Sequence, residues 1–191
     1  MKPSRLVLCA LFLSACGTLV PSTAARLAAF SPLEANPSDI AVALVLPQDL
    51  RVRKDGAKLD LTAQRSDTGE EFKGAYTLAE TPANTVDFGA GAAANARFYA
   101  IRPADADEMR KAQDKVKAWK ATGLSSKGLG SIGIGLDACT TGAAPAPDAR
   151  VSVYIRTAPG AAFLPLIEKA QLIQLLGAEL LAQLKPCDGP R

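Results

Sequence analysis

The side chains that could carry chemistry in this chain are carboxylates, cysteines, serines and lysines, because the 191 residues include no histidine. Without histidine, neither a Ser-His nor a Cys-His nucleophile pair can form, and no metal can be held by imidazole. Ser125, Ser126 and Lys127 could supply a Ser/Lys nucleophile pair. Their spacing differs from S-x-x-K and they lie in a polar stretch, so we interpret them as an ordinary loop.

Two acidic clusters are the other candidates for catalysis, as carboxylate pairs for glycan cleavage. One is Glu70-Glu71, and the other is Asp105, Asp107 and Glu108. Glycan hydrolysis needs two carboxylates that flank one bond, whereas adjacent residues point apart and the second cluster suits a helix start. Neither cluster has the D-x-D-x-D-G spacing of a calcium loop. We therefore expect no catalytic residue, no metal site and no cofactor.

Residues 128–133 (GLGSIG) formally match the dinucleotide-binding string G-x-G-x-x-G. That fingerprint requires a strand before the string and a helix after it. Here a polar stretch precedes the string and an alternating, strand-like segment follows. The strand interpretation places Gly133 and Gly135 on one face, over which another element could pack closely, such as a helix containing Trp119. We therefore expect no nucleotide.

The N-terminus has the layout of a signal peptide. A cationic start is followed by an eight-residue apolar run, residues 6–13, which is too short to span a bilayer. Leu13-Ser14-Ala15-Cys16 then resembles the lipobox of bacterial lipoproteins. The resemblance implies cleavage after Ala15, a lipid on Cys16 and a mature chain anchored on the periplasmic or extracellular side of a membrane. The alternative is an ordinary signal peptide that is cut further along the chain.

Charge narrows the range of partners. The chain has 22 basic and 19 acidic residues, and loss of residues 1–15 with Lys2 and Arg5 leaves 20 basic and 19 acidic. A net charge near +1 argues against a nucleic-acid partner. Gly17 follows the lipobox, where that family uses aspartate for inner-membrane retention, so the resemblance favours the outer membrane. The expected partners are the membrane, through the lipid on Cys16, and an envelope protein or a cell-wall component.

Two further cysteines, Cys139 and Cys187, remain in the mature chain, because Cys9 leaves with the signal peptide. In an oxidising envelope compartment two such cysteines most often pair. We expect a Cys139–Cys187 disulfide. The alternative is a reactive thiol at Cys139, although no neighbour in the sequence would activate it.

Alternating hydrophobicity predicts a single β-rich domain at residues 39–191, after a signal peptide at 1–15 and a flexible tether at 16–38. Asp55-Gly56 and Asp67-Thr68-Gly69 predict turns between strands, and residues 83–95 read as a long loop. Pro165 indicates an edge or a bulge in the last strand. The strand patterns lie near residues 40–46, 50–52, 59–63, 72–78, 97–101, 132–136, 151–155 and 163–167.

One helix is predicted within the β pattern, at about residues 103–121. Asp105 could cap it, with Glu108 completing a capping box. Leucines recur every four residues from Leu172 to Leu184, which predicts a C-terminal helix weakened at Gly177, although a strand continuing to about Leu172 is also possible. The apolar face of the inserted helix consists of Met109, Ala112, Val116 and Trp119.

These patterns predict an α+β protein that is mainly β: an antiparallel β-sandwich or open barrel with one inserted helix and a C-terminal helix. The expected function is a non-catalytic binding or structural module of the envelope. The alternative is a lipid-anchored hydrolase that uses carboxylates or a Ser/Lys pair. A concave pocket with converging ionisable groups would favour the hydrolase, and an exposed apolar patch would favour the binding module.

Overall fold

The computed structural model describes residues 34–65, 67–82, 96–121 and 130–187. The signal peptide, the lipobox with Cys16 and most of the tether lie outside the described residues. So do the predicted loop at 83–95, the Ser125-Ser126-Lys127 string and the first glycine of the G-x-G-x-x-G string. At the end of the predicted tether, residues 35–39 form part of the domain, since the Arg110 and Gln113 side chains donate hydrogen bonds to Ser38 Oγ and to the Ala35 carbonyl.

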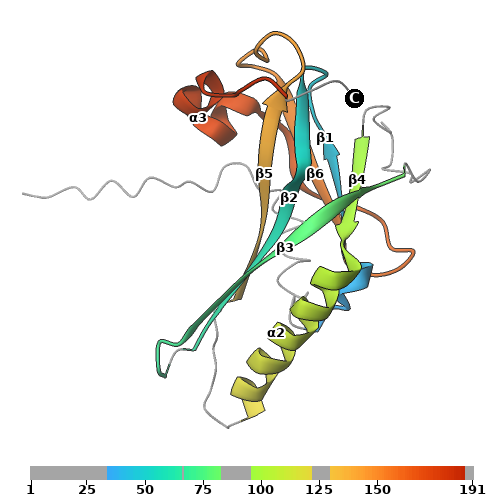
Figure 1. Ribbon diagram of the computed structural model, residues 1–191, viewed down its shortest axis with the longest axis vertical. Coiled ribbons are helices and arrows are strands. Elements are labelled where there is room, and N and C mark those ends of the chain that lie inside the picture. The colour runs from blue at the N-terminus through green and yellow to red at the C-terminus, as the bar shows by residue number, and fades with distance from the viewer. Residues whose placement is uncertain (1–33, 66, 83–95, 122–129, 188–191) are drawn as a thin grey trace, which may run out of the picture.

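Seven antiparallel strands form one curled sheet in the order β5-β2-β3-β4-β1-β6-β7 (Figure 1). The sheet leaves β5 and β7 as open edges, so the open-barrel form of the predicted fold class is confirmed. A short 3-10 helix, η1, precedes the sheet, and two α-helices lie near opposite ends of it. The elements are η1 Pro37–Asp39, β1 Ala41–Val45, β2 Leu50–Gln64, β3 Glu71–Thr81, β4 Ala96–Ile101, α2 Pro103–Ala121, β5 Gly130–Thr140, β6 Arg150–Arg156, β7 Leu164–Gln171 and α3 Leu172–Ala182.

Helix α2 covers the inner face of the sheet with the apolar stripe that the sequence predicts. Its four stripe residues are 0 to 8% exposed and share one core with the inward residues of β1, β2, β3 and β4. The predicted capping box is wrong, because the helix begins at Pro103, which fits the first helical position. Asp105 therefore lies in the first turn, where its Oδ2 accepts a 2.6 Å hydrogen bond from Arg102 Nε.

The predicted turn at Asp55-Gly56 is also wrong, since β2 runs without reversal from Leu50 to Gln64. Its two halves pair with the same neighbour, β5, in the same direction. Val52 lies opposite Ala138 and Ala57 lies opposite Leu136, so residues 53–56 face a single residue of β5. The positive φ of Asp55, 58°, serves a β-bulge and not a hairpin.

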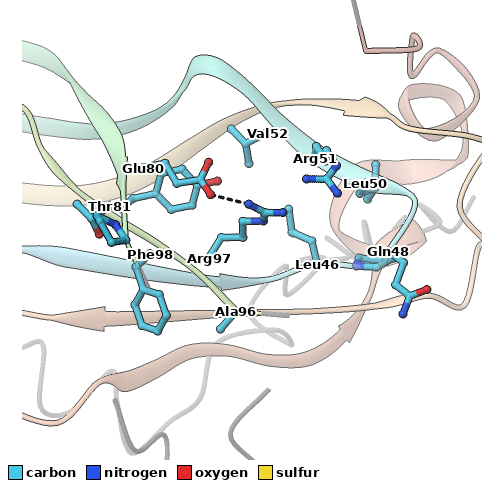
Figure 2. Close-up of a pocket in the computed structure, with 13 residues that line it drawn as sticks. Leu46, Gln48, Leu50, Arg51, Val52, Glu80, Thr81, Ala96, Arg97 and Phe98 are labelled. Carbon is cyan, nitrogen blue, oxygen red and sulfur yellow. Dashed lines mark hydrogen bonds and ion pairs between the residues drawn. The ribbon is translucent and has the colours of Figure 1, made fainter. Parts of the chain in front are cut away.

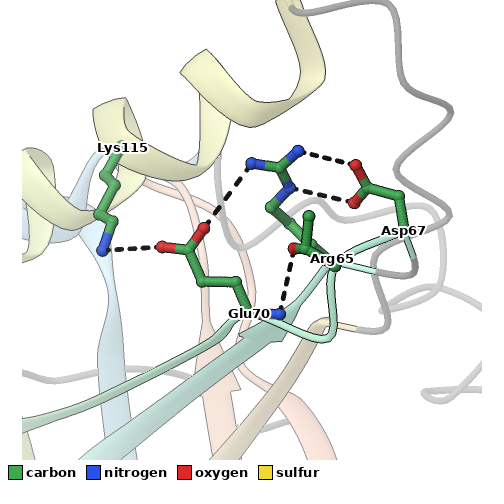
Figure 3. A network of polar contacts seen from close by, with 5 residues as sticks. Arg65, Asp67, Glu70 and Lys115 are labelled. Carbon is green, nitrogen blue, oxygen red and sulfur yellow. Dashed lines mark hydrogen bonds and ion pairs between the residues drawn. The ribbon is translucent and has the colours of Figure 1, made fainter.

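The true turn at residues 67–69 joins β2 and β3 into a long hairpin that lies beside α2 in Figure 1. A polar network ties the hairpin tip to the helix (Figure 3). Arg65 donates two hydrogen bonds to the carboxylate of Asp67, at 3.1 and 2.7 Å. Glu70 bridges Arg65 Nη1 at 3.6 Å and Lys115 Nζ at 3.4 Å. The network therefore connects both strands of the hairpin to α2.

None of the helices in the described residues covers the glycine face of β5, which corrects the expectation from the sequence. Gly133 and Gly135 pair with Asp60 and Lys58 of β2, on the side away from the core. Ile132 and Ile134, which alternate with these glycines, face inward and contact the core that contains Trp119. The glycines therefore lie on the outer side of the sheet.

The C-terminal part follows the predicted pattern in most respects. β7 is an edge strand whose register with β6 shifts near Pro165, as the proline indicates. β7 continues to Gln171, and α3 follows directly. Gly177, with φ 76°, interrupts α3 as a non-helical residue. The Cys139–Cys187 disulfide is present, with a Cα–Cα distance of 4.9 Å, and it holds the residues after α3 against β5.

Candidate functional site

A cleft of about 640 Å³ lies between the start of β2 on one side and the end of β3 and the start of β4 on the other. This volume is within the range of small-molecule sites. Its walls come from four segments: the β1–β2 connection, β2, β3 and β4. The lining residues are Leu46, Pro47, Gln48, Leu50, Arg51, Val52, Glu80, Thr81, Pro82, Ala96, Arg97, Phe98 and Tyr99.

The cleft exists because β3 changes neighbours along its length. Its first part pairs with β2 up to Leu78, which lies opposite Ala57. Its last part, from Leu78 to Thr81, pairs with β4. Before Ala57, at the bulge, β2 has no partner in β3 within the described residues and pairs only with β5. The sheet therefore splits at the bulge, and the cleft occupies the gap.

Charged groups from both sides of the split line this gap. Arg97 of β4 donates a hydrogen bond through Nη1 to Glu80 Oε1 of β3 at 2.7 Å, and Figure 2 shows this pair among the lining residues. The two side chains are 44% and 51% exposed, so a ligand can reach them. Arg51 contributes a second, half-buried guanidinium from β2. Among the described lining residues, the two arginines exceed the single carboxylate by one charge.

Tyr99 forms the buried part of this group. The residue is 5% exposed and belongs to the main core. Burial, with a smaller contribution from the negative charge of Glu80, raises the pKa of its hydroxyl to about 12, and the positive charges of Arg97 and Arg51 oppose this rise. All three charged residues line the same cleft as Tyr99. Near neutral pH the phenol keeps its proton and can donate a hydrogen bond.

The acidic clusters from the sequence do not line this cleft. Four of their five carboxylates form ion pairs with separate basic residues. Glu70 pairs with Arg65 and Lys115, Glu71 with Lys73, Asp105 with Arg102, and Asp107 with Arg110. In the described ranges no cluster of three or more His, Cys, Asp or Glu residues could hold a metal ion.

A second hollow, of about 570 Å³, lies between α3 and β5. It is lined by leucines, of which Leu136 and Leu180 are 38% and 57% exposed. Arg53, Asp137 and Lys185 form its polar rim. This is an exposed apolar surface of the kind that binding modules carry.

The sequence analysis did not identify Arg51, Glu80 or Arg97 as site residues. Each is a charged residue in a β-strand, and such a charge ordinarily faces solvent. One signal was present: Arg97 has the same strand parity as Tyr99 and Ile101, which are both core residues. A charged residue on the inward face of a strand is a candidate for a binding site. Such a residue can be recognised only when the inward face of the strand is known.

None of the helices in the described part of the chain combines the length and the apolar character needed to span a membrane. Comparisons of the chain with models of protein families, with curated proteins and with solved structures find no match. The function is therefore argued from the N-terminal sequence and from the cleft.

Proposed function

We propose that this chain is a lipid-anchored lipoprotein of the bacterial envelope, with the lipid on Cys16. Its domain acts as a non-catalytic binding module that faces the periplasm or the cell surface, at the outer membrane in preference to the inner. The lipobox-like Leu13-Ser14-Ala15-Cys16 supports the anchor. The cleft between β2 and β4 supports the binding role and is the observation that carries it.

The cleft is concave and holds several ionisable groups, a feature that could also suit a hydrolase. The chemistry of these groups favours binding. Arginine and tyrosine both stay protonated near neutral pH, and burial raises the pKa of Tyr99 further, to about 12. Among the described lining residues Glu80 is the single carboxylate, and it is held by Arg97, whereas glycan hydrolysis uses two. The exposed leucines between α3 and β5 add a second surface suited to binding.

The anchor is tested by expressing the full chain in a bacterium and following acylation with radiolabelled palmitate. Cys16→Ala should abolish the label and release the protein from membranes washed with high salt. Cys9→Ala is the matched control, since it removes a cysteine from the same segment and should leave both properties unchanged. A Cys16→Ala protein that still carries acyl groups would rule out the anchor.

The binding role is tested with a photo-crosslinking amino acid at Gln48, an exposed residue that lines the cleft. Gln64 is the matched control, because it is exposed but lies at the far end of β2. In intact cells, crosslinking at Gln48 should attach an envelope component that crosslinking at Gln64 does not attach. Equal products from both positions would contradict a binding role for the cleft.

A further inference from the structure

We propose that the cleft binds an oxyanion, a carboxylate or phosphate group on a small polar ligand, through Arg97, Arg51 and the Tyr99 hydroxyl. This inference rests on the proposed binding function and names the chemistry of its ligand.

The first support is the balance of donors and acceptors in the cleft. Arg97, Arg51 and Tyr99 all present hydrogen-bond donors, and both arginines are cationic. Glu80 is the one anionic acceptor among the described lining residues. A ligand that accepts hydrogen bonds and carries negative charge therefore matches the wall, whereas a cation would meet two guanidinium groups.

The second support is the position of Arg97. Its neighbours along the inward face of β4, Tyr99 and Ile101, are core residues, so the strand directs Arg97 to the inner side of the sheet. Within the described residues its guanidinium makes one hydrogen bond, to Glu80. A guanidinium is a planar fork that can hold an oxyanion by parallel hydrogen bonds. Its other N–H groups are thus available to a ligand while Glu80 holds the side chain in place.

The third support is Tyr99. Within the described part of the chain its hydroxyl makes no hydrogen bond to another side chain or to the backbone, although the residue is almost fully buried. A tyrosine hydroxyl is protonated near neutral pH, and burial with the charge of Glu80 raises the pKa of Tyr99 further. A hydroxyl without a protein partner can donate its proton to a ligand, and an oxyanion held by Arg97 would accept that hydrogen bond.

The carboxylate of Glu80 competes with the ligand for the guanidinium of Arg97. Neutralising it should strengthen anion binding, whereas neutralising Arg97 should weaken it. A purely structural ion pair would not produce opposite effects on ligand affinity. The pair Arg110–Asp107 is the matched control, since Arg110 is 45% exposed and lies on α2, outside the cleft.

The experiment uses the full chain purified in detergent and titrated separately with sodium phosphate and sodium succinate at constant ionic strength. Thermal unfolding is followed by Trp119 fluorescence, and the apparent Kd is taken from the concentration dependence of Tm. We expect Arg97→Gln to raise the apparent Kd roughly tenfold or more, the value of a lost charge-assisted hydrogen bond. Glu80→Gln should lower it a few-fold, as removal of a competing charge does. Arg110→Gln and Asp107→Asn should leave it unchanged.

Binding of phosphate alone, of succinate alone or of both supports the proposal and identifies which oxyanion the cleft accepts. An equal rise in Tm in all variants would indicate general salt exclusion and would overturn the proposal. An Arg97→Gln protein that binds the anions as tightly as the wild type would also overturn it. If Arg97→Gln does not fold, Glu80→Gln decides, since weaker binding in that variant overturns the proposal. The crosslinking experiment at Gln48 does not depend on the charge of the ligand. A specific crosslink without anion binding would therefore contradict the oxyanion proposal and leave the proposed binding role standing.

Discussion

At the scale of single residues, Asp55 and Gly56 determine where the sheet splits. Asp55 adopts the left-handed region, which aspartate tolerates better than most residues. Gly56 passes close to β5: a Cβ at this position would lie 2.9 Å from the backbone oxygen of Asp137 and 3.0 Å from that of Arg53. Backbone atoms cannot move away as a flexible side chain can. The bulge therefore requires glycine at residue 56, and the cleft depends on the bulge.

Gly56→Ala should destabilise the domain by about 1–3 kcal/mol, the usual cost of inserting a methyl group into a closely packed position. Urea unfolding of the two proteins measures this difference. Gly133→Ala is the control, because among the described residues its added Cβ would find only Asp60 Cβ within 4 Å, at 3.8 Å. If the two alanine variants are equally stable, the close approach at the bulge is not a constraint.

The pH dependence of stability should include a contribution from Asp67. The hydrogen bond from Arg65 lowers the pKa of the Asp67 carboxyl below its unfolded value. A lowered folded-state pKa stabilises the protein above the unfolded pKa, and this contribution is lost as pH falls through the folded pKa. Asp67→Asn should therefore destabilise the protein at pH 7, and the difference from the wild type should shrink in acid.

Urea unfolding at pH 7 and at about pH 3 measures this shift, the lower value lying below the ordinary pKa of aspartate. Asp148→Asn is the control, since Asp148 forms no ion pair within the described residues. A wild-type advantage over Asp67→Asn that persists unchanged in acid would show that Arg65 does not hold the carboxylate.

At the scale of elements, α2 and the β2–β3 hairpin stabilise each other. The helix buries its apolar stripe against the inner face of the sheet, and Trp119 is the last residue of that stripe. Arg65 of the hairpin and Lys115 of the helix lie 6.0 and 5.4 Å from the Trp119 ring centroid. The same two cations hold Glu70. The hairpin tip and the last turns of α2 are thus joined by both apolar and polar contacts.

Trp119→Ala should cost about 3–5 kcal/mol of unfolding free energy, as removal of a buried large aromatic residue does. Trp119 is 8% exposed, and it is the only tryptophan in the chain. The folded protein should therefore show blue-shifted emission that iodide quenches poorly. Lys111→Ala, on the exposed face of α2, should change stability by no more than about 0.5 kcal/mol. Red-shifted, quencher-accessible emission would mean that α2 presents this face to solvent.

At the scale of the whole molecule, the C-terminal segment closes one end of the curled sheet. Thr140 of β5 pairs in parallel with Pro186, and Cys187 N donates to the Thr140 carbonyl at 2.9 Å. Arg53, in the bulge of β2, donates to the Pro186 carbonyl at 3.1 Å. Arg51, on the cleft wall, is the register partner of Cys139. The disulfide therefore secures the segment that supports both the bulge and the cleft.

Replacing Cys139 and Cys187 together by serine should destabilise the protein by about 4 kcal/mol, because the bond closes a loop with a sequence separation of 48 residues. Urea unfolding of the double variant, with the oxidised wild type as reference, measures this loss. A thiol assay on the denatured, unreduced mature protein should detect no thiol from either position. Two reactive thiols per chain would contradict the disulfide.

The sequence by itself determined the features that depend on local periodicity. The strand patterns, the helix at 103–121 with its buried stripe and the interruption at Gly177 all follow from side chains spaced along one element. The Cys139–Cys187 pairing followed from the small number of cysteines in an expected envelope protein. Burial along a single strand or helix depends on which residues alternate, and that information is local.

Only the tertiary structure decided what the Asp55-Gly56 pair does and where the charged cleft lies. The same dipeptide can form a turn or a bulge, and the choice depends on whether the two flanking segments pair with each other or with a third strand, here β5. Arg51, Glu80 and Arg97 come from three strands, and nothing in their local sequence shows that β3 leaves β2 at Ala57. Their meeting is a consequence of strand order and register, which result from contacts between residues far apart in the chain.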